Sequence, residues 1–494
     1  MKKSILYLFF SLFLITGCLK TKKASFDVSS PAGFFFFGGI VSAIAAANST
    51  ASFSIPDPNL TFSNVQNTSV TVSWKSASAV SGTITYKAYF SLISDMDTVA
   101  NMESNGSFTQ DYAASVNQMT FSGLIPNKYY YFNVAAQNSG TKLNYTKKCI
   151  QVYQDSTVTD CSFDPLSVKG TAATVIGTCG TTGTTNGSFS AAQFKDPLYM
   201  QTVGNNIFLT EAHMNSGSCA IRKLDMTNSL VTVYAGNIGS CSSYTDSTLT
   251  SSYFRSPHGI TYDGTNLYVN DYFAHTVRKI SSANVTTLAG TDLSNSYADG
   301  TGSAARFNNP IGMFYDGTSV FVGDYNNCRI RKINPSTGDV STFAGKGCPP
   351  LADSDGIGTA AMLNGGAGSI DTDGKYFYVA EMGNHRIRKI DISTGNVSTL
   401  AGPSSCGTSA CIAGSSDGTG SAASFNSPHS LLYINKYLFV MDYGSGNLRR
   451  INASTGETAT VANVSGIFNA FGLAFYNKKL YTSLRTHYCI KSVQ

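Results

Sequence analysis

The C-terminal two thirds of the chain repeat one pattern of hydrophobic and polar positions. The copy from Ala304 to Gly345 contains four short runs rich in β-branched and aromatic residues, at Ile311–Tyr315, Ser319–Gly323, Arg329–Ile333 and Val340–Ala344. Turn-forming residues separate the runs, at Asp316-Gly317, Tyr325–Asn327 and Ser336–Asp339. Short strands joined by tight connections predict an antiparallel meander of four strands in each copy.

Further copies of this unit run over Ala191–Gly236, Ser251–Gly290, Ala360–Gly402 and Ala422–Asn463, and a truncated one begins near Phe468. A lone meander cannot bury both of its faces, so the copies have to pack against one another. Four-stranded units at this period are typical of propeller blades rather than of solenoid coils. We therefore predict a β-propeller.

Four short motifs recur in the copies. They read F-x-x-P-x-G, D-G-x-x-x-Y/F-V-x-D, I-R-K-I and G-x-V-S/T-T-x-A-G. In this order they resemble the NHL repeat family, over roughly Cys161 to Gln494. The resemblance implies a β-propeller, often of six blades, for residues 161–494.

The two ends of the repeat region are complementary. Gly170–Gly177 reads like a fourth strand with no first three strands before it, and the copy at Phe468–Val493 has three strands and no fourth. We predict that the N-terminal strand completes the last blade, which gives six blades and leaves no unpaired blade edge.

The region 51–153 has a different pattern. Val70, Val72 and Trp74 alternate with polar residues, and Ile84, Tyr86 and Ala88 do so again around Lys87, as in strands of a sandwich. These runs resemble a fibronectin type III domain. The resemblance gives Trp74 the role of core tryptophan and Tyr130 that of the corner tyrosine. The predicted fold is all-β, and this domain is expected to act as a spacer or adhesion module.

The N-terminus has the features of an export signal, predicted at residues 1–17. Lys2 and Lys3 precede an apolar stretch from Ile5 to Ile15, and Thr16-Gly17-Cys18 follows. The ending resembles the lipobox of bacterial lipoproteins, which implies lipidation of Cys18 and anchoring to a membrane. The alternative is an ordinary signal peptide with an incidental cysteine.

A lipidated tether is predicted at residues 18–50. Leu19, in place of aspartate, favours the outer membrane, with the periplasmic or surface face left open. The apolar run Phe34–Ala47 is shorter than a membrane-spanning helix. It is interpreted as a low-complexity spacer, with a second membrane-inserted element as the alternative.

The eleven cysteines are compatible with an oxidising compartment. Cys219 and Cys328 precede the third run of their copies, and Cys241 and Cys348 follow the fourth. Cys489 and Cys179 occupy the same two places across the predicted composite blade. The predicted disulfides are Cys219–Cys241, Cys328–Cys348, Cys179–Cys489, Cys406–Cys411 and Cys149–Cys161. Metal sites are the alternative, but no Cys/His spacing supports them.

Acidic residues end the second run of five copies: Glu211, Asp271, Asp324, Glu381 and Asp442. Leu484, followed by Arg485, takes this place in the last copy. A ring of carboxylates near one mouth of the channel could bind a cation. The alternative is structural, with each acid accepting turn amides and pairing with the arginine of its own copy, Arg222, Arg278, Arg331, Arg388 or Arg449.

Aromatic residues are expected at the same mouth. Tyr272, Tyr325 and Tyr443 follow three of the acids, and His258 and His429 follow the repeat proline. Together with the acids they are the candidate ligand-binding residues, since an aromatic rim with His and carboxylates suits a peptide or a glycan. Alternatively, the tyrosines pack between blades.

Three Asp-Gly-x-Gly segments begin at Asp299, Asp355 and Asp417. They lack the repeated acids of a calcium loop and the lysine of a phosphate-binding loop, so we interpret them as turns between blades.

Composition excludes a dedicated nucleic-acid binder. The formal charge is +5, and loss of Lys2 and Lys3 with the signal leaves about +3. The sequence predicts an exported, membrane-anchored monomer whose propeller binds a protein or a glycan, with no catalytic residue, cofactor or metal assigned. The alternatives are a metal-dependent hydrolase or lyase acting at the channel mouth, and an envelope protein whose propeller only contacts its neighbours.

Overall fold

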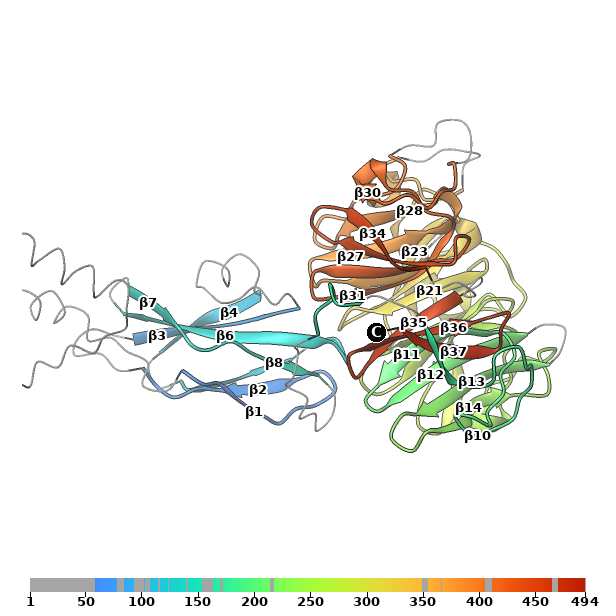
Figure 1. Ribbon diagram of the computed structural model, residues 1–494, viewed down its shortest axis with the longest axis horizontal. Coiled ribbons are helices and arrows are strands. Elements are labelled where there is room, and N and C mark those ends of the chain that lie inside the picture. The colour runs from blue at the N-terminus through green and yellow to red at the C-terminus, as the bar shows by residue number, and fades with distance from the viewer. Residues whose placement is uncertain are drawn as a thin grey trace, which may run out of the picture.

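The computed structural model describes residues 58–77, 84–92, 102, 107–113, 116–122, 124–138, 141–152, 163–168, 172–213, 217–348, 354–365, 367–404, 411–463 and 470–493. These residues form an N-terminal β-sandwich and a C-terminal β-propeller (Figure 1). The predicted export signal, Cys18 and the apolar run Phe34–Ala47 lie outside the described residues. Within the described residues no helix is long and apolar enough to cross a membrane.

The sandwich has two antiparallel sheets. One contains β1 (Thr61–Ser63), β2 (Val70–Ser73) and β5 (Gln118–Phe121). The other contains β4 (Ser107–Ala113), β3 (Ile84–Ser91), β6 (Tyr129–Asn138) and β7 (Thr141–Asn144), with β8 (Lys148–Gln151) also paired to β6.

Two structural predictions for the sandwich are confirmed. The Trp74 ring is buried and lies 5.7 Å from the ring of Tyr86. The hydroxyl of Tyr130 accepts a hydrogen bond from the backbone amide of Ile125 at 3.0 Å, which is the contact expected of a corner tyrosine. The resemblance to the fibronectin type III family therefore gave both side chains their observed roles.

The propeller has six sheets arranged as blades. Blade 1 contains β11 (Pro197–Val203), β12 (Asn206–His213), β13 (Ser218–Asp225) and β14 (Leu230–Asn237). Blade 2 contains β16 (Pro257–Tyr262), β17 (Leu267–Asp271), β18 (Thr276–Ile280) and β19 (Asn284–Gly290). Blade 3 contains β21 (Pro310–Tyr315), β22 (Val320–Asp324), β23 (Arg329–Ile333) and β24 (Asp339–Ala344).

The remaining blades follow the same order. Blade 4 contains β26 (Ala367–Thr372), β27 (Tyr376–Glu381), β28 (Arg386–Asp391) and β29 (Asn396–Ala401). Blade 5 contains β31 (Pro428–Ile434), β32 (Tyr437–Asp442), β33 (Asn447–Asn452) and β34 (Glu457–Asn463). Blade 6 contains β35 (Ala470–Tyr476), β36 (Lys479–Leu484), β37 (Cys489–Val493) and β9 (Ala173–Ile176).

The first five blades have an additional short strand on the outer edge, which the sequence did not predict. These strands are β10 (Gly187–Ser188), β15 (Ser247–Thr248), β20 (Gly300–Thr301), β25 (Gly356–Ile357) and β30 (Gly418–Thr419). The last three come from the Asp-Gly-x-Gly segments, which are therefore part of the blades rather than turns alone. The 3₁₀ turns are η1 (Leu249–Ser251), η2 (Gly302–Ala304), η3 (Tyr325–Asn327), η4 (Gly358–Ala360), η5 (Met382–Asn384) and η6 (Gly420–Ala422).

Strand β9 pairs with β37, so the start of the propeller region supplies the fourth strand of blade 6. Cys179 and Cys489, whose Cα atoms are 5.0 Å apart, form a disulfide beside this pair. The strands of blade 6 lie next to those of blade 1 in Figure 1, where red meets green. The predicted pairing of the two ends is present.

Two further disulfides, Cys219–Cys241 and Cys328–Cys348, are also as predicted. Cys149 and Cys411 take part in disulfides as well. Their predicted partners, Cys161 and Cys406, lie outside the described residues.

The innermost strands β11, β16, β21, β26, β31 and β35 follow one another around the channel, with β35 beside β11. Glycine allows this close approach at several points. A Cβ atom on Gly259 would lie 2.0 Å from the carbonyl oxygen of Ile311, and one on Gly472 would lie 2.2 Å from that of Leu198. At these positions a side chain would clash with the next innermost strand, and glycine avoids the clash.

The sandwich covers one mouth of the channel, where the innermost strands end. Lys128, just before β6, forms an ion pair of 2.6 Å with Asp371 at the end of β26. The Asn127 side-chain oxygen accepts a hydrogen bond of 2.8 Å from the amide of Gly204, and the Tyr129 ring lies 6.2 Å from that of Phe475. In Figure 1, β6 reaches from the sandwich to the propeller. The mouth where these strands begin is not covered by the sandwich.

Candidate functional site

The five carboxylates predicted for the channel mouth are buried inside the blades. Each lies within 3.6 Å of an arginine of its own blade, and both side chains of every pair are fully buried: Glu211–Arg222, Asp271–Arg278, Asp324–Arg331, Glu381–Arg388 and Asp442–Arg449. Glu381 also pairs with Arg386 at 2.7 Å. This placement favours the structural alternative over a cation site.

The same arginines have a second acidic partner on the outer edge of four blades. Arg278, Arg331, Arg388 and Arg449 contact Asp246, Asp299, Asp355 and Asp417 at 2.7 to 3.0 Å. In blade 1 the side-chain oxygen of Asn186 takes this place. Three of these acids open the Asp-Gly-x-Gly segments, so those segments provide a structural carboxylate rather than a calcium or phosphate site.

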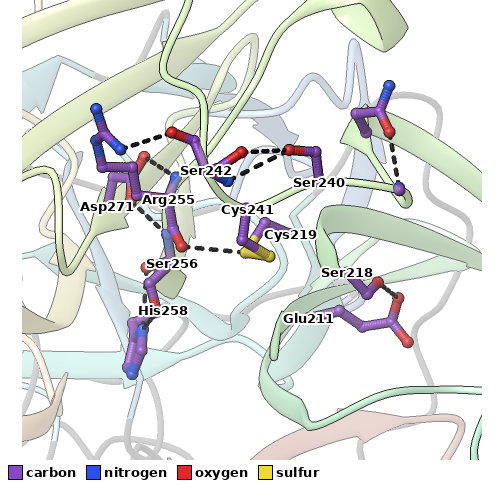
Figure 2. Close-up of a disulfide and its surroundings, with 12 residues drawn as sticks. Glu211, Ser218, Cys219, Ser240, Cys241, Ser242, Arg255, Ser256, His258 and Asp271 are labelled. Atoms are coloured by element: carbon purple, nitrogen blue, oxygen red, sulfur yellow. Dashed lines mark hydrogen bonds between the residues drawn. A yellow bond between two sulfur atoms is a disulfide. The ribbon is translucent and has the colours of Figure 1, made fainter. Parts of the chain in front are cut away.

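Each inner acid also holds the loop that leads into the innermost strand. Asp271 accepts hydrogen bonds from the amides of Arg255 at 3.0 Å and Ser256 at 2.7 Å (Figure 2). Figure 2 also shows Glu211 turned toward Ser218, away from His258. Burial raises the pKa of Asp271, against the lowering effect of Arg278. Burial likewise raises the pKa of Asp442 to about 6.

The residue after each strand-end acid, and after Leu484 in blade 6, lies at the mouth away from the sandwich. In blade order these residues are Ala212, Tyr272, Tyr325, Met382, Tyr443 and Arg485. The three tyrosines and Met382 are half-buried against one hydrophobic cluster. Arg485 keeps 40% of its side chain exposed and lies 3.3 Å from Asp196. The structure therefore brings together the tyrosines predicted for this mouth and adds Met382 and Arg485. We refer to these six residues as the rim.

The two predicted histidines lie beneath the rim. The His258 ring stacks on Tyr272, with centroids 4.6 Å apart. The His429 ring lies 3.9 Å from Phe471, which in turn contacts Tyr443 at 5.7 Å. Burial, with a smaller contribution from the charge of Arg485, lowers the pKa of His258 to about 4 and that of His429 to about 3. Both imidazoles are therefore neutral at neutral pH.

Tyr199 crosses the channel below the histidines and was not predicted. Its hydroxyl donates a hydrogen bond of 2.8 Å to the carbonyl of Gly368 and lies 3.0 Å from Nδ1 of His429. The equivalent positions in the other blades carry only Gly or Ser, at Gly259, Gly312, Ser369, Ser430 and Gly472. One tyrosine among small residues is the feature of the sequence that could have revealed it.

The tyrosines of the rim also pack across blade boundaries, as the alternative interpretation proposed. The backbone carbonyl of Tyr272 accepts a hydrogen bond from the Asn309 side chain of the next blade. The ring of Tyr325 lies against Gly365 of blade 4. The two interpretations are compatible, because each ring is only half-buried. Within the described ranges no group of three or more His, Cys, Asp or Glu side chains is placed to hold a metal ion.

Comparison with known proteins supports the assignment of both domains. Residues 54–151 match the family model of the fibronectin type III domain. The N-terminal sandwich is a fibronectin type III domain. Over 144 residues the chain is 31% identical to human NHL repeat-containing protein 2, which covers 27% of this chain and 20% of that protein. It is also 26% identical over 303 residues to the Arabidopsis thaliana protein SUPPRESSOR OF QUENCHING 1, chloroplastic, covering 58% of this chain. The chain spans only 20% of the length of the human relative and 28% of that of the Arabidopsis thaliana relative.

Two of the solved structures to which the chain is similar come from Bacteroides thetaiotaomicron. A protein of unknown function is 15% identical, with a TM-score of 0.49, and covers 89% of this chain and 99% of its own. A protein described as an auxiliary nutrient binding protein is 11% identical, with a TM-score of 0.48 and coverage of 89% and 98%.

Proposed function

We propose that the NHL propeller is a binding module whose contact surface is the rim. One observation carries this proposal: the acids at the ends of the second strands are buried in ion pairs, while the next residues bring Tyr272, Tyr325, Met382, Tyr443 and Arg485 to one mouth. Tyrosine, methionine and arginine are enriched at protein interfaces, where large, partly apolar side chains contribute most of the binding energy.

The ligand we propose is a protein segment, with a glycan as the alternative. Half-buried rings anchored on His258 and Phe471 present preorganised flat faces, so little side-chain entropy is lost on binding. The neutral histidines add no charge at neutral pH, and the cation of the rim, Arg485, is opposed by Asp196. A segment rich in aromatic or aliphatic side chains suits such a surface.

The module is further proposed to be anchored in the bacterial envelope through lipidated Cys18, at the outer membrane, as a monomer whose ring is closed by β9. The charged, apolar and small residues of the first eighteen positions support export and lipidation. The disulfides, among them Cys179–Cys489, Cys219–Cys241 and Cys328–Cys348, are compatible with an oxidising compartment. Metabolic labelling with a fatty acid tests the anchor, and Cys18→Ser is expected to abolish the label.

Binding at the rim can be tested with envelope proteins and a glycan array. The change Tyr325→Ala is expected to weaken capture of the bound component at least tenfold, because it removes a ring at the centre of the row of tyrosines. Tyr297→Ala is the matched control, since Tyr297 is an exposed tyrosine that contacts Arg329 of its own blade. Equal loss with both variants, or with neither, would contradict the proposal.

A further inference from the structure

A cavity of about 150 Å³ lies at the opposite mouth, between the fibronectin type III domain and the propeller. Its walls come from the ends of the innermost strands and from the segment Ile125–Tyr131 of the sandwich. Tyr199 is at its inner end. The cavity is therefore separate from the rim, and it exists only because the two domains meet.

Aromatic rings provide several of its walls. Tyr129 of the sandwich and Phe314, Tyr433 and Phe475 of the propeller are among the lining residues. The Phe475 ring is held by Phe163 at 4.7 Å and by Tyr129 at 6.2 Å, and the Tyr433 ring stacks on Tyr378 at 6.0 Å. These contacts fix the rings, so the cavity is bounded by flat apolar faces.

Two buried polar atoms among the lining residues have no hydrogen-bond partner within the described part of the chain: the side-chain nitrogen of Asn127 and the side-chain oxygen of Asn435. The amide of Asn127 is oriented by the hydrogen bond of its oxygen to Gly204. Buried polar atoms rarely lack a partner, and leaving one unsatisfied costs roughly 1–3 kcal/mol. One donor and one acceptor are thus available to a molecule in the cavity.

The two buried charged residues that line the cavity have opposite charges, which cancel. Nζ of Lys128 lies 2.6 Å from both carboxylate oxygens of Asp371, and Asp371 also accepts the amides of Thr372 and Tyr433 at 2.8 Å. The other charged lining residue, Lys478, is exposed at the edge. A buried charge without a partner is costly, so a neutral occupant suits the site best.

We propose that this cavity binds a neutral polyol of one ring, the size of a single sugar residue. A cavity of this volume accepts a six-membered ring, since about 150 Å³ is enough for benzene. A sugar ring has C–H faces that pack on aromatic rings and hydroxyl groups that both donate and accept hydrogen bonds, as the Asn127 and Asn435 amides require. Because both domains contribute contacts, the occupant fixes their relative orientation.

The full-length protein in detergent, titrated with the methyl glycosides of glucose, galactose and N-acetylglucosamine, tests the proposal by saturation-transfer NMR and calorimetry. Phenol is the control ligand, because it has a six-membered ring but only one hydroxyl group. We expect at least one glycoside to bind in the millimolar range or tighter, and phenol to bind at least tenfold more weakly. Tight binding of phenol with no glycoside bound, or no binding of any glycoside, would overturn the assignment.

The location is tested with Asn435→Gly. Asn435 has a φ of +45°, which glycine adopts without strain, so this change removes the amide and keeps the turn. Asn477→Gly is the matched control, because Asn477 occupies the same place in the Asn-Lys turn of blade 6, has a φ of +46° and is not a lining residue. We expect at least a tenfold loss for Asn435→Gly and no change for Asn477→Gly. Unchanged binding in Asn435→Gly, or loss in Tyr325→Ala, would overturn the location.

Discussion

At the scale of single residues, the blade arginine is the side chain that ties several repeat motifs together. Arg331 contacts Asp324 at 2.8 Å and Asp299 at 2.7 Å, and its guanidinium carbon lies 5.1 Å from the Phe307 ring. The motif phenylalanine, the strand-end acid and the Asp-Gly-x-Gly acid thus converge on one buried cation. The arginine, the strand-end acid and the motif phenylalanine recur together in blades 1, 2 and 5.

Replacing Arg331 by Met is expected to lower the free energy of unfolding by roughly 3–5 kcal/mol, because Asp324 is left buried without its cation. Equilibrium urea unfolding measures this change. Lys332→Met is the control, since Lys332 is exposed in the same strand. The double variant Arg331→Met with Asp324→Leu should cost less than Arg331→Met alone, as blade 6 has Leu484 and Lys491 at these positions. If the free-energy changes of the two substitutions simply add up in the double variant, the ion pair between Arg331 and Asp324 does not contribute to stability.

The buried histidines predict a pH dependence. The pKa of His429 is lowered to about 3 by burial, with further contributions from His258 and Arg485, whereas an unfolded chain has a histidine pKa near 6.5. The unfolded state therefore binds more protons, and stability falls as the pH falls from about 6.5 toward 3, by up to ~1.4 kcal/mol per pH unit for this residue. His258 acts in the same direction.

Urea unfolding at pH 7 and pH 5 tests this dependence. The difference between the two pH values is expected to shrink in His429→Gln, which keeps a hydrogen-bonding side chain toward Tyr199 but does not titrate. A difference that is unchanged in this variant would show that other groups control the acid response.

Strands and turns were the features most readily predicted from the sequence. The predicted run Arg329–Ile333 coincides with β23, and the neighbouring strands differ by a single residue at their ends. Turn chemistry explains this success: the Asp316 carboxylate accepts the amides of Thr318 and Ser319, which fixes where the hairpin reverses. The outer strands were missed because a two-residue strand carries no alternation.

A disulfide joins the two ends of the propeller region. The disulfide Cys179–Cys489 spans 310 residues, and Cys219–Cys241 spans 22. In the chain-entropy model the longer loop stabilises by about 2 kcal/mol more. Replacing Cys179 and Cys489 by Ser should therefore lower the melting temperature further than replacing Cys219 and Cys241. Equal decreases in melting temperature would indicate that Cys179–Cys489 stabilises the protein no more than a disulfide that closes a short loop.

At the scale of the whole molecule, the sequence predicted both domains but not how they meet. Trp74 and Tyr130 identify the sandwich through contacts within it, whereas the contacts of Asn127 and Lys128 with Gly204 and Asp371 join positions distant in sequence. A lone Lys in a turn gives no indication of such a partner. The pairing of Asp271 and its equivalents with the arginine of their own blade was one of two alternatives open from the sequence, and the buried ion pairs of the structure favour it.

The contact between the two domains predicts that they keep a fixed relative orientation in solution. Lys128→Ala leaves Asp371, which is 3% exposed, without its cation, and is expected to loosen the sandwich from the propeller. Small-angle X-ray scattering should show a larger radius of gyration and a broader distance distribution. Lys142→Ala, at an exposed position in β7, is the control. A compact profile for Lys128→Ala would show that the remaining contacts suffice.

The pairing of β9 with β37 has a consequence for how the protein is made. Blade 6 cannot form until β37 has left the ribosome, because β9 has no partner before then. Cys179 emerges before Cys219, Cys241, Cys328 and Cys348, yet its partner Cys489 emerges last. Oxidation in order of emergence would join Cys179 to the wrong partner, so the native pairing requires that Cys179 stay reduced until Cys489 emerges or that a wrong disulfide be rearranged.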